Sequence, residues 1–200
     1  MPLLAQYRQR DDTVVLGLAR GGVAVGLALA EGLNLPLGVL VVRKLGYPGN
    51  PEFAVGAVDA DGEYVLGEEF RQSGLDQTPA FQRVLQQELL ELHRRVKLFN
   101  PIPLAIEGKI VIVADDGIAT GQTDLSAINY LKRHGAKEVV AAAPVASLEA
   151  VELLKSTGAR VVVLTTPANF MAVGQFYEYF PQITDEEVLA IINLHNRKDQ

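Results

Sequence analysis

The sequence predicts an α/β fold in which helices flank a largely parallel, twisted sheet. Short runs of branched apolar residues alternate with helical patterns along most of the chain. Several runs are apolar at nearly every position, as strands buried on both faces are. No long linker, internal repeat or low-complexity tract interrupts this alternation, so residues 1–200 are expected to form a single domain. In such sheets ligands bind where the strands end, so the loops after strands are the expected place of a functional site.

The first elements are two strands with a helix between them. Thr13–Leu18 is an apolar run, Val23–Gly32 has a helical pattern, and Leu35–Lys44 is expected to be the second buried strand. Leu45–Glu52 (LGYPGNPE) follows, with two glycines and two prolines in eight residues. That composition is typical of a loop.

A hairpin and a long helix are expected next. Phe53–Val58 and Glu63–Leu66 flank a turn that contains Asp61-Gly62, which is a hairpin signal. Thr78–Phe99 follows a helical period, with Thr78 suited to cap it and proline at the first helical position. The apolar stripe of this helix consists of Phe81, Val84, Leu85, Leu89, Leu92 and Val96.

The C-terminal half repeats the order of strand and helix three times. The expected strands are Lys109–Asp115, Glu138–Ala146 and Arg160–Pro167. The expected helices are Asp124–His134, Leu148–Thr157 and Thr184–Arg197, the last with Thr184 as its cap.

Composition excludes several classes of function. With 48% hydrophobic and 21% charged residues, the chain resembles ordinary globular proteins. A net charge of −6 argues against a general nucleic-acid-binding protein, which usually has a basic surface. The absence of cysteine excludes disulfides and thiolate chemistry. No run of about 18 apolar residues or signal-peptide pattern occurs, so we expect a cytoplasmic protein without a membrane partner.

The end of the first strand carries Arg20, Gly21 and Gly22 just before a helix. Backbone N–H groups at a helix N-terminus attract anions, and the guanidinium fork of arginine suits phosphate. The spacing fits neither a dinucleotide fingerprint nor a Walker A loop. Two interpretations remain open here, an anion site and a tight turn between strand and helix.

Arg43 and Lys44 follow the second apolar run and precede the loop Leu45–Glu52. They are interpreted either as a cationic clamp on a polyphosphate beneath a closing lid or as a solvated basic pair before an ordinary loop.

The third strand end, VADDGIATGQT (Val113–Thr123), combines an acidic pair with a turn rich in glycine and threonine. The N–H groups of residues 119–123 and the hydroxyls of Thr120 and Thr123 form a potential phosphate nest. Asp115 and Asp116 would repel a phosphate, but they accept hydrogen bonds from vicinal hydroxyls or hold hydrated Mg²⁺. The combination predicts a site for a sugar phosphate.

The segment Ile110–Thr123 resembles the phosphoribosyl-pyrophosphate (PRPP) signature of type I phosphoribosyltransferases. That signature has four hydrophobic residues, an acidic pair, a run of small residues and Thr-Gly-x-Thr, and Ala114 is one additional small residue here. ARGG resembles the pyrophosphate loop of the family, and the basic pair lies where members carry cations at a mobile catalytic loop. The resemblance covers approximately residues 13–145.

The resemblance implies a role for each loop. Asp115 and Asp116 would hold the ribose hydroxyls and contact Mg²⁺, the implied cofactor, through the ligand or water. The catalytic residues would be Arg43, Lys44 and Asp116. The 5′-phosphate would be wrapped by Gly117, Ile118, Ala119, Thr120, Gly121, Gln122 and Thr123. The pyrophosphate would be bound by Ala19, Arg20, Gly21, Gly22, Arg43 and Lys44. A non-proline cis peptide, frequent in this family, would fall at Ala19–Arg20.

The implied activity is Mg²⁺-dependent transfer of the phosphoribosyl group of PRPP to a nitrogenous base, with release of pyrophosphate. The enzyme would act in nucleotide metabolism as a homodimer, with Leu45–Glu52 as a lid that excludes water. Two alternatives stay open. One is a non-catalytic module that senses PRPP or a nucleotide, and the other is a different phospho-sugar enzyme that uses the same loop.

The acceptor is less well indicated. Ala119 stands where hypoxanthine–guanine enzymes commonly carry an aspartate that approaches the purine, which argues against a 6-oxopurine bound through that contact. The resemblance places the core at approximately residues 13–165 and a hood over the acceptor in residues 166–200. Phe176 and Tyr177 are the candidates for acceptor contact, because aromatic rings stack on bases. Core packing or a subunit contact explains the same aromatic cluster.

Overall fold

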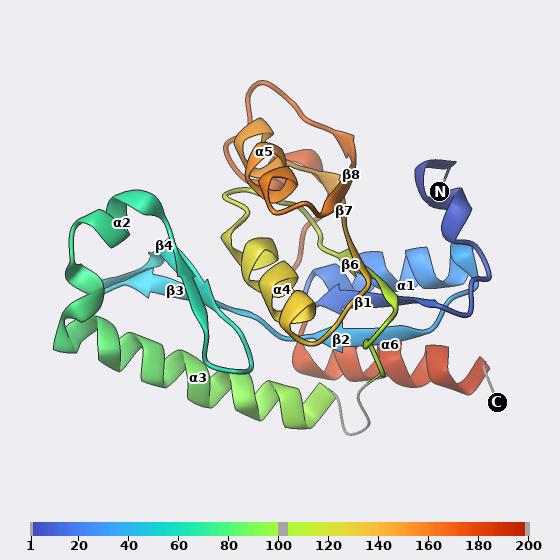
Figure 1. The fold of residues 1–200 in the computed structure, drawn as a ribbon, viewed down its shortest axis with the longest axis horizontal. Helices are drawn as coiled ribbons and strands as arrows, with labels where there is room; N and C mark the ends of the chain where they lie inside the picture. The colour runs from blue at the N-terminus through green and yellow to red at the C-terminus, as the bar shows by residue number, and fades with distance from the viewer. Residues whose placement is uncertain (1, 100–103, 199–200) are drawn as a thin grey trace.

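A five-stranded parallel sheet forms the centre of the computed structural model, which describes residues 2–99 and 104–198 (Figure 1). The strand order is β2-β1-β6-β7-β8, which confirms the predicted α/β class. The chain reverses direction across the sheet between β1 and β6, so the loops after these two strands lie side by side at a topological switch point. The strands are β1 (Thr13–Leu18), β2 (Leu37–Leu40), β6 (Ile110–Ala114), β7 (Glu138–Val145) and β8 (Arg160–Thr165).

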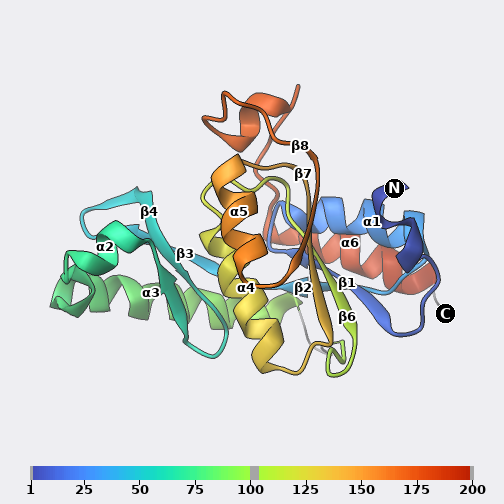
Figure 2. The ribbon, with the colours of Figure 1, turned by 45° about the horizontal axis from the view of Figure 1, so that its top comes forward.

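Helices cover both faces of the main sheet (Figure 2). Alternate residues of β1 enter different cores: Val14 and Leu16 pack with residues of α4 and α5, whereas Val15 packs with residues of α1. The helices are α1 (Gly22–Leu33), α4 (Gln122–Arg133), α5 (Leu148–Ser156) and α6 (Asp185–Lys198), with short 3₁₀ segments η1 (Pro2–Tyr7) and η3 (Val173–Phe176). Within the described residues, no helix is both long and apolar enough to cross a bilayer.

The prediction of one strand over Leu35–Lys44 was wrong. Strand β2 ends at Leu40, which pairs with Leu18, the last residue of β1. Beyond that point β1 offers no further partner, and the chain passes through Val41 and Val42 into β3 (Arg43–Tyr47) of a second, antiparallel sheet. The basic pair therefore begins a strand of the second sheet.

The prediction of a loop over Leu45–Glu52 was also wrong for most of its length. Strand β3 continues to Tyr47, and β4 (Asn50–Val58) begins directly after a turn at Pro48 and Gly49. The pairing is irregular on both sides of Gly46, where an added Cβ atom would lie 2.7 Å from the backbone of Pro51. Glycine and proline here belong to a bulged hairpin.

The predicted hairpin and long helix are confirmed. Strand β5 (Tyr64–Leu66) pairs with β4, and α2 (Glu68–Gln72) and η2 (Leu75–Gln77) lead into α3 (Pro79–Phe99). The hydroxyl of Thr78 accepts a hydrogen bond from the N–H of Phe81 at 3.3 Å, as expected of a cap. We call residues 43–99 the arm; it extends away from the main sheet in Figure 1.

Polar side-chain contacts hold the arm against α4. The guanidinium of Arg133 lies 2.7 Å from Asp59 and 3.1 Å from Asp61, and His134 lies 3.0 Å from Asp61. The carboxylate of Asp59 is buried, so Arg133 supplies the partner that a buried charge requires. This connection fixes the turn between β4 and β5 relative to the main sheet.

Candidate active site

Two loops meet at the switch point. The first loop (residues 19–21) follows β1, and the second loop (residues 115–121) follows β6. A Cβ atom at Gly21 would lie 1.7 Å from Oδ2 of Asp116, and one at Gly22 would lie 2.2 Å from the carbonyl oxygen of Ala114. A side chain at Gly22 would clash with backbone, and one at Gly21 would displace the carboxylate of Asp116, so both glycines serve close approach of the loops. The peptide bond between Ala19 and Arg20 is cis, as the family resemblance implies.

The second loop presents unpaired backbone donors. In the described part of the chain, no hydrogen-bond acceptor faces the N–H groups of Ala119, Thr120 and Gly121. Gly121 has a φ of 75° and precedes α4, whose N-terminus has no side-chain cap. Free N–H groups at the positive end of a helix dipole form an anion site. The residues predicted to wrap a 5′-phosphate therefore have a geometry suited to it.

Ser147 holds the second loop in place through hydrogen bonds, a role that the sequence analysis missed. Its hydroxyl donates to the carbonyl of Ala119 at 2.6 Å and accepts from the N–H of Ala150 at 3.0 Å, where it caps α5. Its backbone N–H also donates to the carbonyl of Ile118 at 2.9 Å. A serine before a helical pattern indicates a cap, but no local signal connects it to a loop distant in sequence.

The acidic pair lies in an environment that disfavours its charge. Oδ1 of Asp115 accepts a hydrogen bond from the N–H of Asp116 at 2.9 Å. Burial raises the pKa of Asp115 well above its ordinary value, and the nearby carboxylates of Asp124 and Asp116 raise it further. Burial also raises the pKa of Asp116, while the ammonium of Lys44 lowers it. Lys44, a residue of the arm, thus lowers the pKa of both Asp115 and Asp116.

Asp124 is a third acid that the sequence analysis assigned only to a helix. It lies in the first turn of α4, is 2% exposed, and its Oδ1 has no hydrogen-bond partner among the described residues. Burial raises its pKa to about 7, although its own backbone N–H and Lys44 act in the opposite direction.

Asp124→Asn is expected to stabilise the protein at pH 8 and to leave it unchanged near pH 4. The folded-state pKa of about 7 exceeds the ordinary aspartate value of 3.8, so the native state binds more protons between these values and loses stability as pH rises through them. Asparagine cannot ionise, which removes a cost of about 2–4 kcal/mol above pH 7. Thermal unfolding from pH 4 to 8 measures this difference. The exposed Asp11→Asn is the control, and a variant no more stable than the parent at pH 8 contradicts the prediction.

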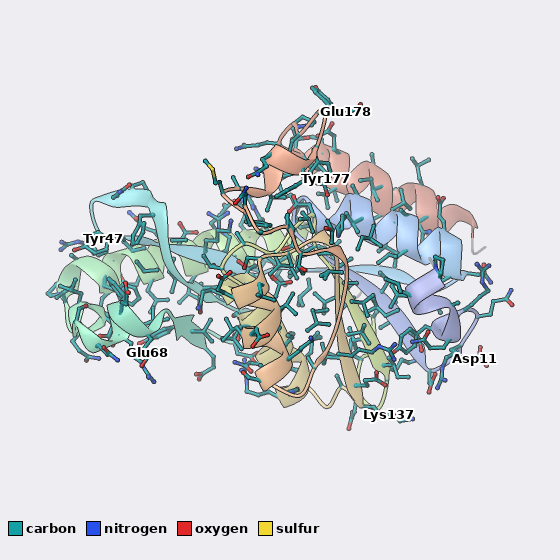
Figure 3. The ribbon with its side chains drawn as sticks, turned by 90° about the horizontal axis from the view of Figure 1, so that it is seen from above. Asp11, Tyr47, Glu68, Lys137, Tyr177 and Glu178 are labelled. Carbon is teal, nitrogen blue, oxygen red and sulfur yellow. The ribbon has the colours of Figure 1, made fainter. Side chains whose placement is uncertain are left out.

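The C-terminal segment covers the second loop. A Cβ atom at Gly117 would lie 2.5 Å from Cγ1 of Val173. Tyr177, which is labelled in Figure 3, donates from its hydroxyl to the carbonyl of Asp116 at 2.6 Å. The ring of Tyr177 packs on Phe180, and the ring of Phe176 packs on Phe170. Tyr177 therefore positions the acidic loop, while Phe176 belongs to an aromatic pair. Residues 199–200 of the expected hood lie outside the described residues.

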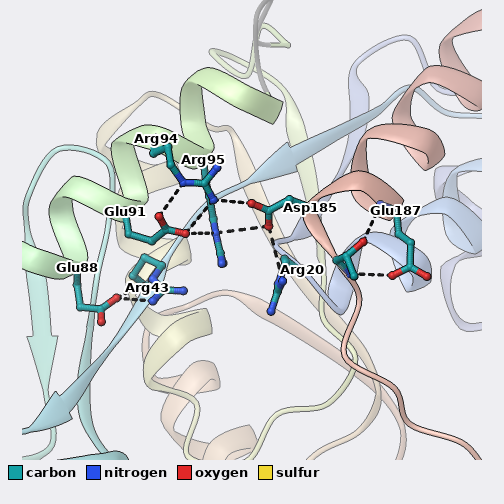
Figure 4. Close-up of polar contacts among 9 residues, drawn as sticks. Arg20, Arg43, Glu88, Glu91, Arg94, Arg95, Asp185 and Glu187 are labelled. Atoms are coloured by element: carbon teal, nitrogen blue, oxygen red, sulfur yellow. Dashed lines mark hydrogen bonds and ion pairs between the residues drawn. The ribbon is translucent and has the colours of Figure 1, made fainter.

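Arg43 and Lys44 act on different groups because successive residues of a strand point to opposite faces. Lys44 faces the acids, whereas Nε of Arg43 donates to Glu88 of α3 at 2.7 Å. Arg20, from the first loop, lies 3.7 Å from Asp185 at the start of α6 (Figure 4). The structure thus brings the predicted cations and acids to one region from three separate elements.

The described residues include no group of three or more His, Cys, Asp or Glu side chains placed to hold a metal ion. The described residues alone therefore offer no complete cage for a metal. Asp115 and Asp116 fit the predicted indirect role, in which a hydrated Mg²⁺ takes most of its ligands from elsewhere.

Comparisons with known proteins find a matching family model and similar chains. The family model described as "Phosphoribosyl transferase domain" matches residues 3–179. The protein named "Putative phosphoribosyl transferase Rv0571c" from Mycobacterium tuberculosis H37Rv is 43% identical over 189 residues, which cover 92% of this chain and 42% of that protein. The chain thus spans about two fifths of the length of the curated relatives it matches.

Solved structures show the same fold. The protein TT1426 from Thermus thermophilus is 40% identical and superposes with a TM-score of 0.75, over 96% of this chain and 94% of that chain. An APRTase from Giardia lamblia is 14% identical, with a TM-score of 0.50 over 84% of this chain and 77% of that chain. The second likeness shows the fold alone.

Proposed function

Because the chain belongs to the family described as the phosphoribosyl transferase domain, we propose that it transfers the phosphoribosyl group of PRPP to a nitrogenous base and releases pyrophosphate. The observation that carries this proposal is the close approach of the first and second loops, where a Cβ atom at Gly21 would lie 1.7 Å from Oδ2 of Asp116 and one at Gly22 would lie 2.2 Å from the carbonyl oxygen of Ala114. This contact joins a hydroxyl-binding acidic pair, a phosphate nest and a cationic loop in one continuous site.

Each part of the site matches one part of PRPP. The unpaired N–H groups of residues 119–121 suit the 5′-phosphate, and the carboxylates of Asp115 and Asp116 suit the ribose 2′- and 3′-hydroxyls. Arg20 directly precedes Gly21 in the first loop and suits the pyrophosphate. Both ends of the ligand are then fixed, which orients the reacting carbon between them.

The chemistry requires no nucleophile from the protein. The bond between C1 of the ribose and the pyrophosphate oxygen breaks, and the electron pair leaves with pyrophosphate. The acceptor nitrogen forms a new bond to C1 and releases its proton to solvent. Positive charge develops on the ribose during this step, and Asp116 in its ionised form would stabilise that charge. The guanidiniums of Arg20 and Arg43 stabilise the departing anion.

Mg²⁺ would be held by the ligand, and Asp115 and Asp116 would contact it through water or through the ribose. When bound, it supplies charge neutralisation of the pyrophosphate. The raised pKa of both carboxyls is consistent with a site whose charge is completed by a cation. Magnesium dependence, a homodimer and a role in nucleotide metabolism are further parts of this proposal.

Incubation of the protein with PRPP, Mg²⁺ and a panel of nitrogenous bases is expected to release pyrophosphate in the presence of at least one base. A coupled phosphate assay measures the release, and calorimetry measures PRPP binding separately. Tight PRPP binding without turnover on any base would instead favour a sensing module. If no pyrophosphate is released and no PRPP binds, the proposal is wrong.

A further inference from the structure

Helix α3 brings a third arginine to the cationic part of the site. Figure 4 shows the guanidiniums of Arg20, Arg43 and Arg95 directed toward a common space from the first loop, β3 and α3. The side chain of Arg95 is only 12% exposed, less than those of Arg20 at 28% and Arg43 at 27%. Burial lowers the pKa of Arg95, and the nearby charges of Arg43 and Arg20 lower it further, which agrees with their proximity.

The carboxylates in this cluster do not satisfy its arginines fully. Arg20 and Arg95 each lie 3.7 Å from Asp185, beyond hydrogen-bond distance. Nε of Arg95 and Oδ1 of Asp185 are buried, and neither makes a hydrogen bond with the described residues. Nε of Arg95 does lie 2.8 Å from Glu91, but as an ion pair without hydrogen-bond geometry. A buried donor without a hydrogen bond is costly, so Nε of Arg95 favours an additional anionic partner.

We propose that Arg95 is a further ligand of the pyrophosphate group of PRPP, so that α3 forms one wall of the active site. This inference rests on the proposed function. Arg20 connects the cluster to the ribose, because it directly precedes the glycine that touches Asp116. A pyrophosphate has enough oxygens to accept hydrogen bonds from three guanidinium groups, whereas a single carboxylate has only two oxygens. The pyrophosphate supplies the acceptors that Asp185 and Glu91 provide only in part.

Arg94 offers a matched control from the same helix. It donates two hydrogen bonds to Glu91, at 2.7 and 2.9 Å, and one to Asp185 at 2.5 Å. Its side chain is 51% exposed and lies on the outer side of the cluster in Figure 4. Arg94 therefore shares the carboxylate partners of Arg95 without reaching the common space.

Calorimetry with three ligands tests the proposal. Mg²⁺-pyrophosphate, PRPP and ribose 5-phosphate are titrated into the parent protein, Arg95→Gln, Arg95→Lys and Arg94→Gln. We expect Arg95→Gln to weaken pyrophosphate and PRPP binding by about 10- to 100-fold, since it removes charge-assisted hydrogen bonds. Arg95→Lys keeps the positive charge but lacks the planar guanidinium. Its affinity for pyrophosphate and PRPP should lie between those of Arg95→Gln and the parent. Ribose 5-phosphate lacks the pyrophosphate, so its affinity should be unchanged in every variant.

The outcomes separate this inference from the proposed function. Pyrophosphate binding by Arg95→Gln within about threefold of the parent overturns the role of Arg95, as does an equal loss for ribose 5-phosphate or for Arg94→Gln. A parent protein that binds PRPP but transfers it to no base overturns the transfer reaction and leaves the inference testable by the same titrations. A parent protein that binds neither PRPP nor pyrophosphate overturns both.

Discussion

Combined Asp115→Asn and Asp116→Asn substitutions are expected to lower the affinity for PRPP by at least about 100-fold, because each carboxylate contributes a charge-assisted hydrogen bond of about 1.5–3 kcal/mol to a ribose hydroxyl. The same substitutions are expected to raise the melting temperature at pH 8. Both carboxyls have pKa values raised by burial, so the folded state holds their protons more tightly than the unfolded state does. Stability is therefore lost as pH rises above the unfolded values, and asparagine removes that loss.

A loss of PRPP affinity together with a gain in stability indicates that the two carboxylates serve ligand binding at a cost to folding. Calorimetry with PRPP and thermal unfolding at pH 8 measure the two quantities. Asp124→Asn is the matched control, since Asp124 is a buried acid of the same region and is too enclosed to touch a ligand. It should raise stability and leave PRPP affinity within about threefold of the parent, well below the loss of one charge-assisted hydrogen bond. Unchanged PRPP affinity in the double variant would falsify the ribose-holding role of the acidic pair.

Gly22→Ala is expected to abolish PRPP binding and to lower the free energy of unfolding by about 3 kcal/mol. The new Cβ atom would lie 2.2 Å from the carbonyl oxygen of Ala114 and 2.9 Å from Cα of Asp115. These are backbone atoms, and Ala114 belongs to a strand paired on both sides, so the strand cannot yield. The first loop must move instead, and Arg20 moves with it.

Denaturant unfolding and PRPP calorimetry measure both effects of Gly22→Ala. Gly67→Ala is the control, because Gly67 has a φ of −58° and an added Cβ atom there would meet its nearest neighbour at 3.7 Å. The control should keep the stability of the parent within about 1 kcal/mol. A Gly22→Ala protein that binds PRPP as the parent does would show that the two loops have more freedom than their contact indicates.

The main sheet was predictable because its signals are local. Each strand is a compact apolar run, and the PRPP-like segment contains its strand, its acids and its phosphate nest in continuous sequence. The break after Leu40 was not predictable, because it depends on where β1 ends. Val41 and Val42 continue the apolar run, so composition alone does not show that they connect two sheets.

Residues that support the site from a distance in sequence also left no readable signal. Ser147 acts through the carbonyl of Ala119, and Asp185 acts through the arginines of α3 and the first loop. Capping residues and acidic first turns are both common at the start of helices. In the sequence, Ser147 and Asp185 therefore look like ordinary residues of a helix N-terminus. Their second partners are set by tertiary packing.

The two-residue connection between the sheets has a consequence for hydrogen exchange. The arm meets the rest of the domain through Val41 and Val42, through the ion pairs of Arg133 and Arg94, and through a hydrophobic cluster that it shares with Val23, Val39 and Val188. Amide exchange in β3–β5 therefore reports openings that break these contacts. A ligand that spans the phosphate nest and the guanidiniums of the arm binds only the closed form, so it slows amide exchange in β3–β5 as well as in its binding loops. A ligand that fills the nest alone protects the second loop and leaves exchange in the arm unchanged.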